Sequence, residues 1–163
     1  MTESEHHILQ SECDRLIANH NTLSLATRSI DGNADISYAP YVRDDGNFYI
    51  FVSELANHTK NLLNHPQASI LFIQAETETD NLFALQRLTL NCQVREIYKG
   101  DPTFADQLEA MTKMFGEIVN VLRVLPDFHL FALTPTSGQF VAGFGKAIPV
   151  DAKGHLQWPT STD

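Results

Sequence analysis

The segment Arg87–Arg95, RLTLNCQVR, alternates apolar and polar residues without a break, and it constrains the fold more than any other part of the chain. Leu88, Leu90, Cys92 and Val94 take one face, and the polar residues take the other. A repeat of two places successive side chains on opposite faces of a strand. The segment therefore predicts a long antiparallel strand, with a core on one side and solvent, a ligand or a second subunit on the other.

Turn signals and apolar periodicity predict the remaining elements. Helical spacing indicates helices at 3–20, 55–64 and 101–125, and hairpin turns are expected at 31–33 and 43–47. The segment 127–147 is expected to form a final hairpin that turns at its proline and glycine. The sum is a mainly β (α+β) protein with six or seven antiparallel strands. Strand and helix do not alternate regularly as in a Rossmann sheet, so we expect a small closed barrel with helices inserted at its rim.

Length and composition indicate a soluble globular protein. The 163 residues suffice for one domain, predicted at 1–150 with the N-terminal helix 1–20 included, followed by a loose polar tail at 151–163. No apolar run approaches the roughly 20 residues that span a bilayer, and the N-terminus does not resemble a signal peptide. Cys13 and Cys92 form no CxxC pair, which favours reduced thiols in a cytoplasmic protein. The net charge of −9 argues against a nucleic-acid partner.

A candidate ligand seat lies where the strand ending at Val52 and Ser53 meets the helix 55–64. The predicted core stripe of this helix is Leu55, Thr59, Leu62 and Leu63, with Asn57, Asn61 and Asn64 facing away and His58 on the shoulder. Free N–H groups and the positive dipole end at a helix start favour an anion. Ser53 either caps the helix or donates to a phosphate, and His58 is either a solvated edge residue or a ligand contact.

Arg87 is the second candidate, at the start of the polar face of the long strand. Its guanidinium suits a phosphate or a carboxylate, and the alternative is a surface ion pair. The chain contains no G-x-x-x-x-G-K-[ST] loop, no G-x-S-x-G elbow and no H-E-x-x-H pair, which argues against three common classes of enzyme.

Four segments together carry a family resemblance: TLSLATRSIDGNADISYAPYV, FYIFVSELANHTKNLLNHPQASILF, RLTLNC and DFHLFALTPTSGQFVAGFGKA. In this order they resemble the pyridoxamine 5′-phosphate oxidase-like, FMN-binding split β-barrel superfamily, and most closely its haem-utilisation (HugZ/HutZ-type) branch. The resemblance implies a split β-barrel and an obligate homodimer with two equivalent ligand sites at the subunit interface.

In the flavin members of this superfamily, the strand that matches Ser37, Tyr38, Ala39 and Pro40 lines the isoalloxazine. The resemblance implies that Val52, Ser53 and the position of His58 hold the FMN phosphate, and that Arg87 completes the site. Here a histidine stands where Lys or Arg is usual, and Lys60 is the nearest substitute cation.

In the haem branch the same interface binds haem. The resemblance then implies that Arg87, His58 and Lys60 receive the propionates. A tail histidine, here His155, would ligate the iron, and Asp127 would orient its imidazole. Three functions follow: a protein that binds haem at the dimer interface, with or without degrading it; an FMN-dependent oxidoreductase; or a non-catalytic haem- or flavin-binding module. The sequence leaves the choice open.

Overall fold

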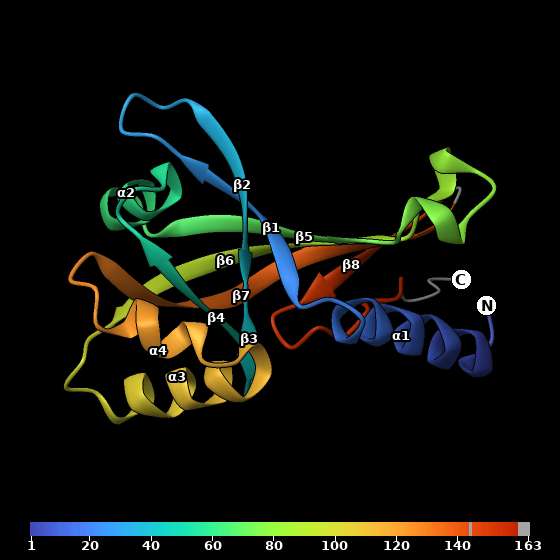
Figure 1. The fold of residues 1–163 in the computed structure, drawn as a ribbon. Helices are drawn as coiled ribbons and strands as arrows, with labels where there is room; N and C mark the ends of the chain where they lie inside the picture. Colours follow the sequence, from blue (N-terminus) through green and yellow to red (C-terminus); the bar gives the residue numbers. More distant parts are fainter. Residues whose placement is uncertain (144, 160–163) are drawn as a thin grey trace.

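In the computed structural model, which describes residues 1–143 and 145–159, eight strands form one antiparallel sheet (Figure 1). Its order is β2 (Ala34–Pro40), β1 (Thr22–Arg28), β5 (Gln67–Ile73), β6 (Arg87–Ile97), β7 (Phe128–Gly143), β4 (Asn47–Ser53) and β3 (Val42–Asp44), with β8 (Lys146–Asp151) also paired to β7. The first half of β7 pairs with β4 and the second half with β8. The sheet ends at β2 and β3 and does not close, so the closed barrel expected from the pattern is wrong and the split barrel is confirmed.

The strand count exceeds the expected six or seven because one expected strand divides. The chain between Ala34 and Asp44 breaks at Tyr41 into β2 and β3, since β2 pairs with β1 whereas β3 pairs with β4. Tyr41 is buried at this break, and its hydroxyl donates hydrogen bonds to the carbonyls of Ile17 and His20.

The expected final hairpin is also misplaced, because β7 runs straight through Pro135–Gly138. The pairing of β6 with β7 shifts register between Asn91 and Cys92, opposite Pro135, and such irregularities tolerate proline. Gly138 is needed for space and not for a turn, since a Cβ there would lie 2.3 Å from the carbonyl oxygen of Thr89. The reversal comes later, between β7 and β8.

The helices match their predicted segments. They are α1 (Glu3–Ala18), α2 (Asn57–Asn64), α3 (Pro102–Phe115) and α4 (Ile118–Arg123), with short 3-10 turns η1 (Glu76–Glu78) and η2 (Leu82–Ala84). Thr2 and Glu5 form a capping box at the start of α1, and Gly116 adopts φ 90° where α3 stops. No helix in the described parts of the chain is long and apolar enough to cross a bilayer.

Two apolar cores hold the sheet and helices together. The larger fills the barrel and contains the inward residues of β6 as predicted, packed with aromatic side chains such as Phe48, Phe72 and Phe131. The smaller lies where α3 and α4 cover the sheet, around Leu108 and Leu130. Cys13 and Cys92 are free thiols within the larger core, and burial raises the pKa of each to about 12.

The C-terminal tail is packed against α1 over its described length and is not loose. Gln10 of α1 donates to the carbonyl of Gly154 and accepts from the N–H of Leu156, which is buried. The ring of Trp158 stacks on His6 with centroids 3.8 Å apart. Residues 160–163 of the predicted tail lie outside the described residues.

Candidate functional site

The structure joins four of the predicted site residues into two hydrogen-bonded pairs beside α2. The ring Nδ1 of His58 lies 2.7 Å from Oγ of Ser37 on β2. Oγ of Ser53, at the end of β4, donates to Oδ2 of Asp127 at 2.6 Å. Residues from four separate segments therefore meet around the start of one short helix.

The face that α2 buries differs from the predicted one. His58, Thr59, Asn61 and Leu62 are buried, whereas Leu63 is exposed. Leu55 is 90% exposed because the helix begins only at Asn57 and Leu55 lies in the preceding turn. The prediction placed Asn61 in solvent, but its amide donates to Thr27 and Asp35 at 3.0 and 2.7 Å. These hydrogen bonds offset the cost of burying an amide.

His58 is a buried hydrogen-bonding group and not the solvated edge residue that was one of its two predicted roles. Its side chain is only 9% exposed, and burial lowers its pKa below the ordinary value of 6.5. A neutral imidazole carries one N–H and one lone pair. Ser37 takes Nδ1, and Nε2 has no hydrogen-bond partner among the described residues.

Ser53 does not cap α2, which was one of its two predicted roles. The N-cap position is Ala56, which has no side chain able to cap, and Oγ of Ser53 instead accepts the N–H of Leu55 within the turn. The N–H of Glu54 donates to the carbonyl of Asp127 at 2.9 Å, so the turn is attached to the start of β7 by both its backbone and Ser53.

A pocket of about 290 Å³ opens between β2 and the start of α2. It is lined by Asp35, Ile36, Ser37, Tyr38, Ala56, Asn57 and His58. Ile36 and Tyr38 point outward and are exposed, as alternation along β2 requires. One chain thus offers a small, half-apolar recess with one neutral histidine.

The other predicted contacts in this region differ in accessibility. Ala39 and Val52 are buried in the barrel core, so their side chains are closed to a ligand. Pro40 and Lys60 are exposed, and Lys60 does not line the pocket.

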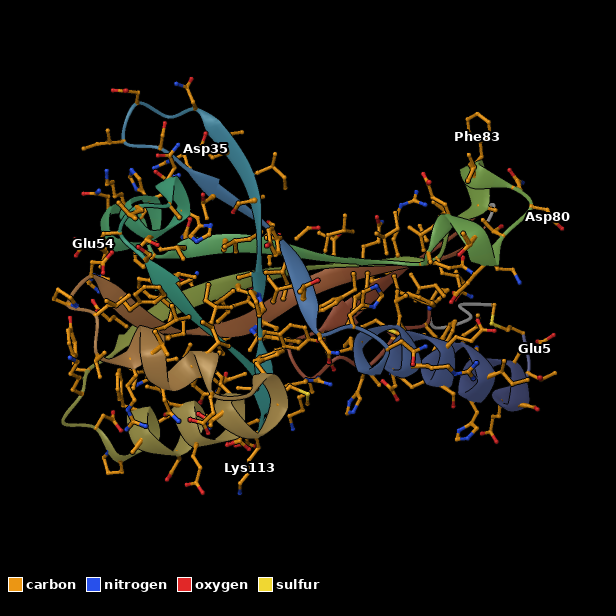
Figure 2. All side chains as sticks on the ribbon, viewed as in Figure 1. Glu5, Asp35, Glu54, Asp80, Phe83 and Lys113 are labelled. Carbon is orange, nitrogen blue, oxygen red and sulfur yellow. The ribbon has the colours of Figure 1, made fainter. Side chains whose placement is uncertain are left out.

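Arg87 lies elsewhere. It pairs with Ile73 at the far end of β5, and its Nη1 donates to the carbonyl of Leu85. Ser37 is level with Ile70, so Arg87 is three residues further along and three strands across, more than about 15 Å away. Figure 2 shows this separation, with Asp35 and Glu54 at one end of the molecule and Phe83 and Asp80, just before Arg87, at the other.

His155 lies apart from Asp127. It follows β8, is 66% exposed, and its Nδ1 is 3.9 Å from Oδ2 of Asp151. Asp151 pairs with Ser137, nine residues along β7 from Phe128, which is about 30 Å of strand. Among residues 1–143 and 145–159, no three His, Cys, Asp or Glu side chains are grouped to hold a metal ion. One chain therefore does not bring the predicted iron ligand to its predicted positioning residue.

Sequence reasoning missed four polar positions here. Asp35 receives the amide of Asn61, and the alternation of β2 would have placed it on the same face as Ser37. His129 of β7 contacts Glu54 and Glu96. Nothing in the spacing of those two glutamates, 42 residues apart in sequence, signals that they meet.

Comparisons with known proteins agree with this architecture. The family model described as pyridoxamine 5′-phosphate oxidase matches residues 9–142. The haem oxygenase HutZ of Vibrio cholerae is 37% identical over 142 residues, which cover 87% of this chain and 81% of that protein.

Solved structures show the same fold. The crystal structure of HutZ from Vibrio cholerae, described as a haem storage protein, superposes with a TM-score of 0.76 at 34% identity, covering 83% of this chain and 94% of that one. Campylobacter jejuni ChuZ gives a TM-score of 0.82 at 27% identity, covering 96% of this chain and 63% of that one. With its split barrel and its match from Leu9 to Ala142, this chain belongs to the pyridoxamine 5′-phosphate oxidase family, on the branch that includes HutZ.

Proposed function

We propose that this protein binds haem at the interface of a homodimer, in two sites that each use residues from both subunits. The observation that carries the proposal is the separation within one chain of the α2 pocket from Arg87. The relative HutZ of Vibrio cholerae is described as a haem oxygenase and, in its crystal structure, as a haem storage protein, which supports haem as the ligand class.

The face proposed for the second subunit is the outer face of β1, β5 and β6. Leu71 of β5 is only half-buried there and Ile73 is exposed, beside small polar residues. A shallow groove of about 370 Å³ crosses this face, with Ser69 and Asn91 hydrogen-bonded on its floor. An apolar strip flanked by small polar side chains suits a flat interface between two sheets.

Two-fold symmetry would explain why the pocket beside α2 and Arg87 lie far apart within one chain. An isologous interface repeats the same contacts in reverse, so one end of the face on one subunit meets the opposite end on the other. If the axis passes near the middle of β5, Arg87 of one subunit approaches the pocket between β2 and α2 of its partner. Each dimer then has two equivalent composite sites.

The residues present fit haem. Ile36 and Tyr38 supply exposed apolar surface for a macrocycle at the edge of the pocket, and Arg87 supplies a fixed cation for a propionate. We propose that the neutral ring of His58 forms a hydrogen bond with the bound haem. Lys60 would lie at the outer edge of the site. Ser53 and Asp127 hold the turn that starts α2. Bound haem would supply redox chemistry that these side chains lack.

The iron ligand we propose is His155 of a partner subunit, oriented by Asp127. Within one chain the two residues are far apart and the tail is hydrogen-bonded to α1, so the assignment requires the second subunit. His155 is exposed and is therefore available to a neighbouring molecule.

Haem is favoured over FMN because of His58. The FMN phosphate is a dianion, and the pocket offers it a neutral imidazole and the carboxylate of Asp35. Haem propionates can instead extend from the pocket toward Arg87 and Lys60. FMN remains the alternative ligand, since the family model is that of a flavin enzyme.

Titration of the purified protein with hemin and, separately, with FMN tests the proposal. We expect a shifted Soret band that saturates at two hemins per dimer, with a smaller shift in His155→Ala. Binding of FMN without a hemin-dependent Soret change would overturn the haem assignment. Adding ascorbate and oxygen to the hemin complex then separates a degrading enzyme, whose Soret band disappears, from a storage protein, whose band persists.

We infer that the protein works in the cytoplasm and that the tail up to Pro159 belongs to the same domain as the barrel. The first inference is supported by the two buried free thiols, Cys13 and Cys92, and the second by the Gln10 hydrogen bonds.

A further inference from the structure

His129 of β7 is held between two carboxylates that come from different elements. Its Nδ1 lies 2.7 Å from Oε2 of Glu96 on β6, and its Nε2 lies 2.8 Å from Oε1 of Glu54 in the turn before α2. The sequence gives no motif for this cluster, and the proposed haem site does not use it.

With both carboxylates ionised, the two contacts call for a doubly protonated ring. Ionised carboxylates only accept hydrogen bonds, and a neutral imidazole has a single N–H, so the two contacts together need an imidazolium. The side chains of His129 and Glu96 are each only 18% exposed, which limits screening of that contact by solvent, whereas the side chain of Glu54 is 51% exposed. The stacked ring of Phe131 covers one face of the imidazole, with centroids 6.1 Å apart.

The acidic groups around His129 come from three elements, namely Glu96 of β6, Glu54 of the turn and Asp127 at the start of β7. Asp127 is occupied by the hydroxyl of Ser53. No lysine or arginine forms a salt bridge with Glu54 or Glu96 in the described part of the chain. His129 is thus the cation that keeps these carboxylates together.

The clamp acts on the segment that starts α2. Glu54 follows Ser53, whose carbonyl accepts the hydroxyl of Thr59. The N-cap Ala56 provides no capping side chain, so hydrogen bonds and ion pairs from this turn fix where α2 begins. His58 is the second residue of that helix.

We propose that His129 is a positioning residue, an imidazolium that ties the turn at Glu54 to β6 and so fixes the start of α2 and the ring of His58. The link to ligand binding rests on the proposed haem site. The clamp itself is a property of the apoprotein and is tested without ligand.

The clamp makes the turn sensitive to pH. Burial lowers the pKa of His129, but hydrogen bonds and charge from Glu96 and Glu54 outweigh burial and raise it above 6.5. A raised pKa in the folded state means that the stabilisation is complete below the unfolded value and is lost as pH rises through the folded value. The turn should therefore loosen as pH rises above 6.5 and through the folded-state pKa of His129.

The direct test follows the ring signals of the seven histidines by NMR between pH 5 and 10, with His129 assigned by their loss in His129→Gln. We expect His129 to titrate above 6.5 and to shift downward in both Glu54→Gln and Glu96→Gln. The matched control is Glu109→Gln, which removes an exposed partner of Lys113 and should leave His129 unchanged. The clamp would be overturned if His129 titrated at or below 6.5, or if its pKa were the same in Glu54→Gln, Glu96→Gln and the wild-type protein.

Amide hydrogen exchange tests positioning. We expect residues 54–59 to exchange about tenfold faster in Glu54→Gln, with 88–94 unchanged, and equal exchange would overturn the positioning role. Hemin affinity should fall about tenfold in the same variant. Failure of the wild-type protein to bind hemin would refute the proposed function and leave the two apoprotein results standing.

Discussion

The two ends of the outer sheet face differ in how their polar groups are satisfied. At the α2 end, His58 and Asn61 are buried and hydrogen-bonded to β2, and Ser53 is bonded to Asp127. At the other end, Arg87 donates to one backbone carbonyl, and Phe83 nearby is 86% exposed.

The difference is consistent with our proposal that folding of one chain fixes the first end and that a second subunit completes the other. A buried polar side chain needs its hydrogen bonds within the chain, because losing one costs about 1–3 kcal/mol. A guanidinium with one internal partner and a neighbouring exposed aromatic ring are available to another molecule. In our account this molecule is a second subunit with its ligand.

The largest expected effect comes from a charge on the proposed interface. Leu71→Glu would bury a carboxylate between the two sheets, so we expect the dissociation constant of the dimer to rise at least about 100-fold, or about 3 kcal/mol. Analytical ultracentrifugation measures this change. Ile118→Glu, which puts the same charge on exposed α4, is the control and should remain dimeric. A Leu71→Glu dimer of unchanged affinity would place the interface elsewhere.

Next in size is the loss of a buried hydrogen-bonded amide at the α2 end. Asn61→Ala removes the bonds to Thr27 and Asp35, and we expect a loss of about 2 kcal/mol in the free energy of unfolding. Asn57→Ala on the exposed side of the same helix should change it by less than about 0.5 kcal/mol. Urea denaturation of both variants tests the contrast, and equal losses would contradict it.

Arg87→Ala, unlike Asn61→Ala, should weaken ligand binding and leave the stability of the protein nearly unchanged. We expect less than about 1 kcal/mol of destabilisation, because only one hydrogen bond to Leu85 is lost, but about a tenfold weaker affinity for hemin. Arg15→Ala, on exposed α1, should change neither quantity. A normal hemin affinity in Arg87→Ala would remove this end from the site.

The smallest effects are those of pH on stability, and the two histidines at the α2 end act in opposite directions. The lowered pKa of His58 means that its stabilisation is complete above 6.5 and is lost as pH falls below that value. The raised pKa of His129 means that its stabilisation is complete below 6.5 and is lost as pH rises through the folded value.

Free energies of unfolding measured from pH 5 to 9 test this pair. His58→Gln should flatten the acid limb of the curve, and His129→Gln should flatten the alkaline limb. If both variants flattened the same limb of the curve, the assigned directions of the two pKa shifts would be contradicted. Asp151 and Glu5, whose pKa values hydrogen bonds lower, act at more acid pH.

Local periodicity of the sequence was sufficient to predict much of the fold but little of the candidate site. The alternation of β6 and the helical spacing of α1 reflect burial of one face, which sequence records directly. Gly138 led to a wrong prediction of a hairpin turn, because glycine is favoured both in turns and where two backbones lie close together, and the second reason applies here. The burial of Asn61 was missed because polar residues are usually exposed, and its hydrogen-bond partners Thr27 and Asp35 lie far away in the sequence.

Long-range contacts explain the remaining differences. The meeting of His129 with Glu54 and Glu96 depends on the pairing of β7 with both β4 and β6, which no local pattern records. Sequence resemblance predicted Ser37, Ser53, His58 and Asp127 as site residues, and the structure joins them in two hydrogen-bonded pairs.

Mixed dimers test the central claim of a composite site most directly. Subunits carrying Arg87→Ala are refolded or co-expressed with subunits carrying His58→Ala, and the differently tagged heterodimer is purified and titrated with hemin. If each site takes Arg87 from one subunit and His58 from the other, one site in the heterodimer carries both substitutions and the other carries none. We predict one hemin per heterodimer bound with wild-type affinity. Two equally weakened sites would show that each chain binds hemin with its own residues and would contradict this account.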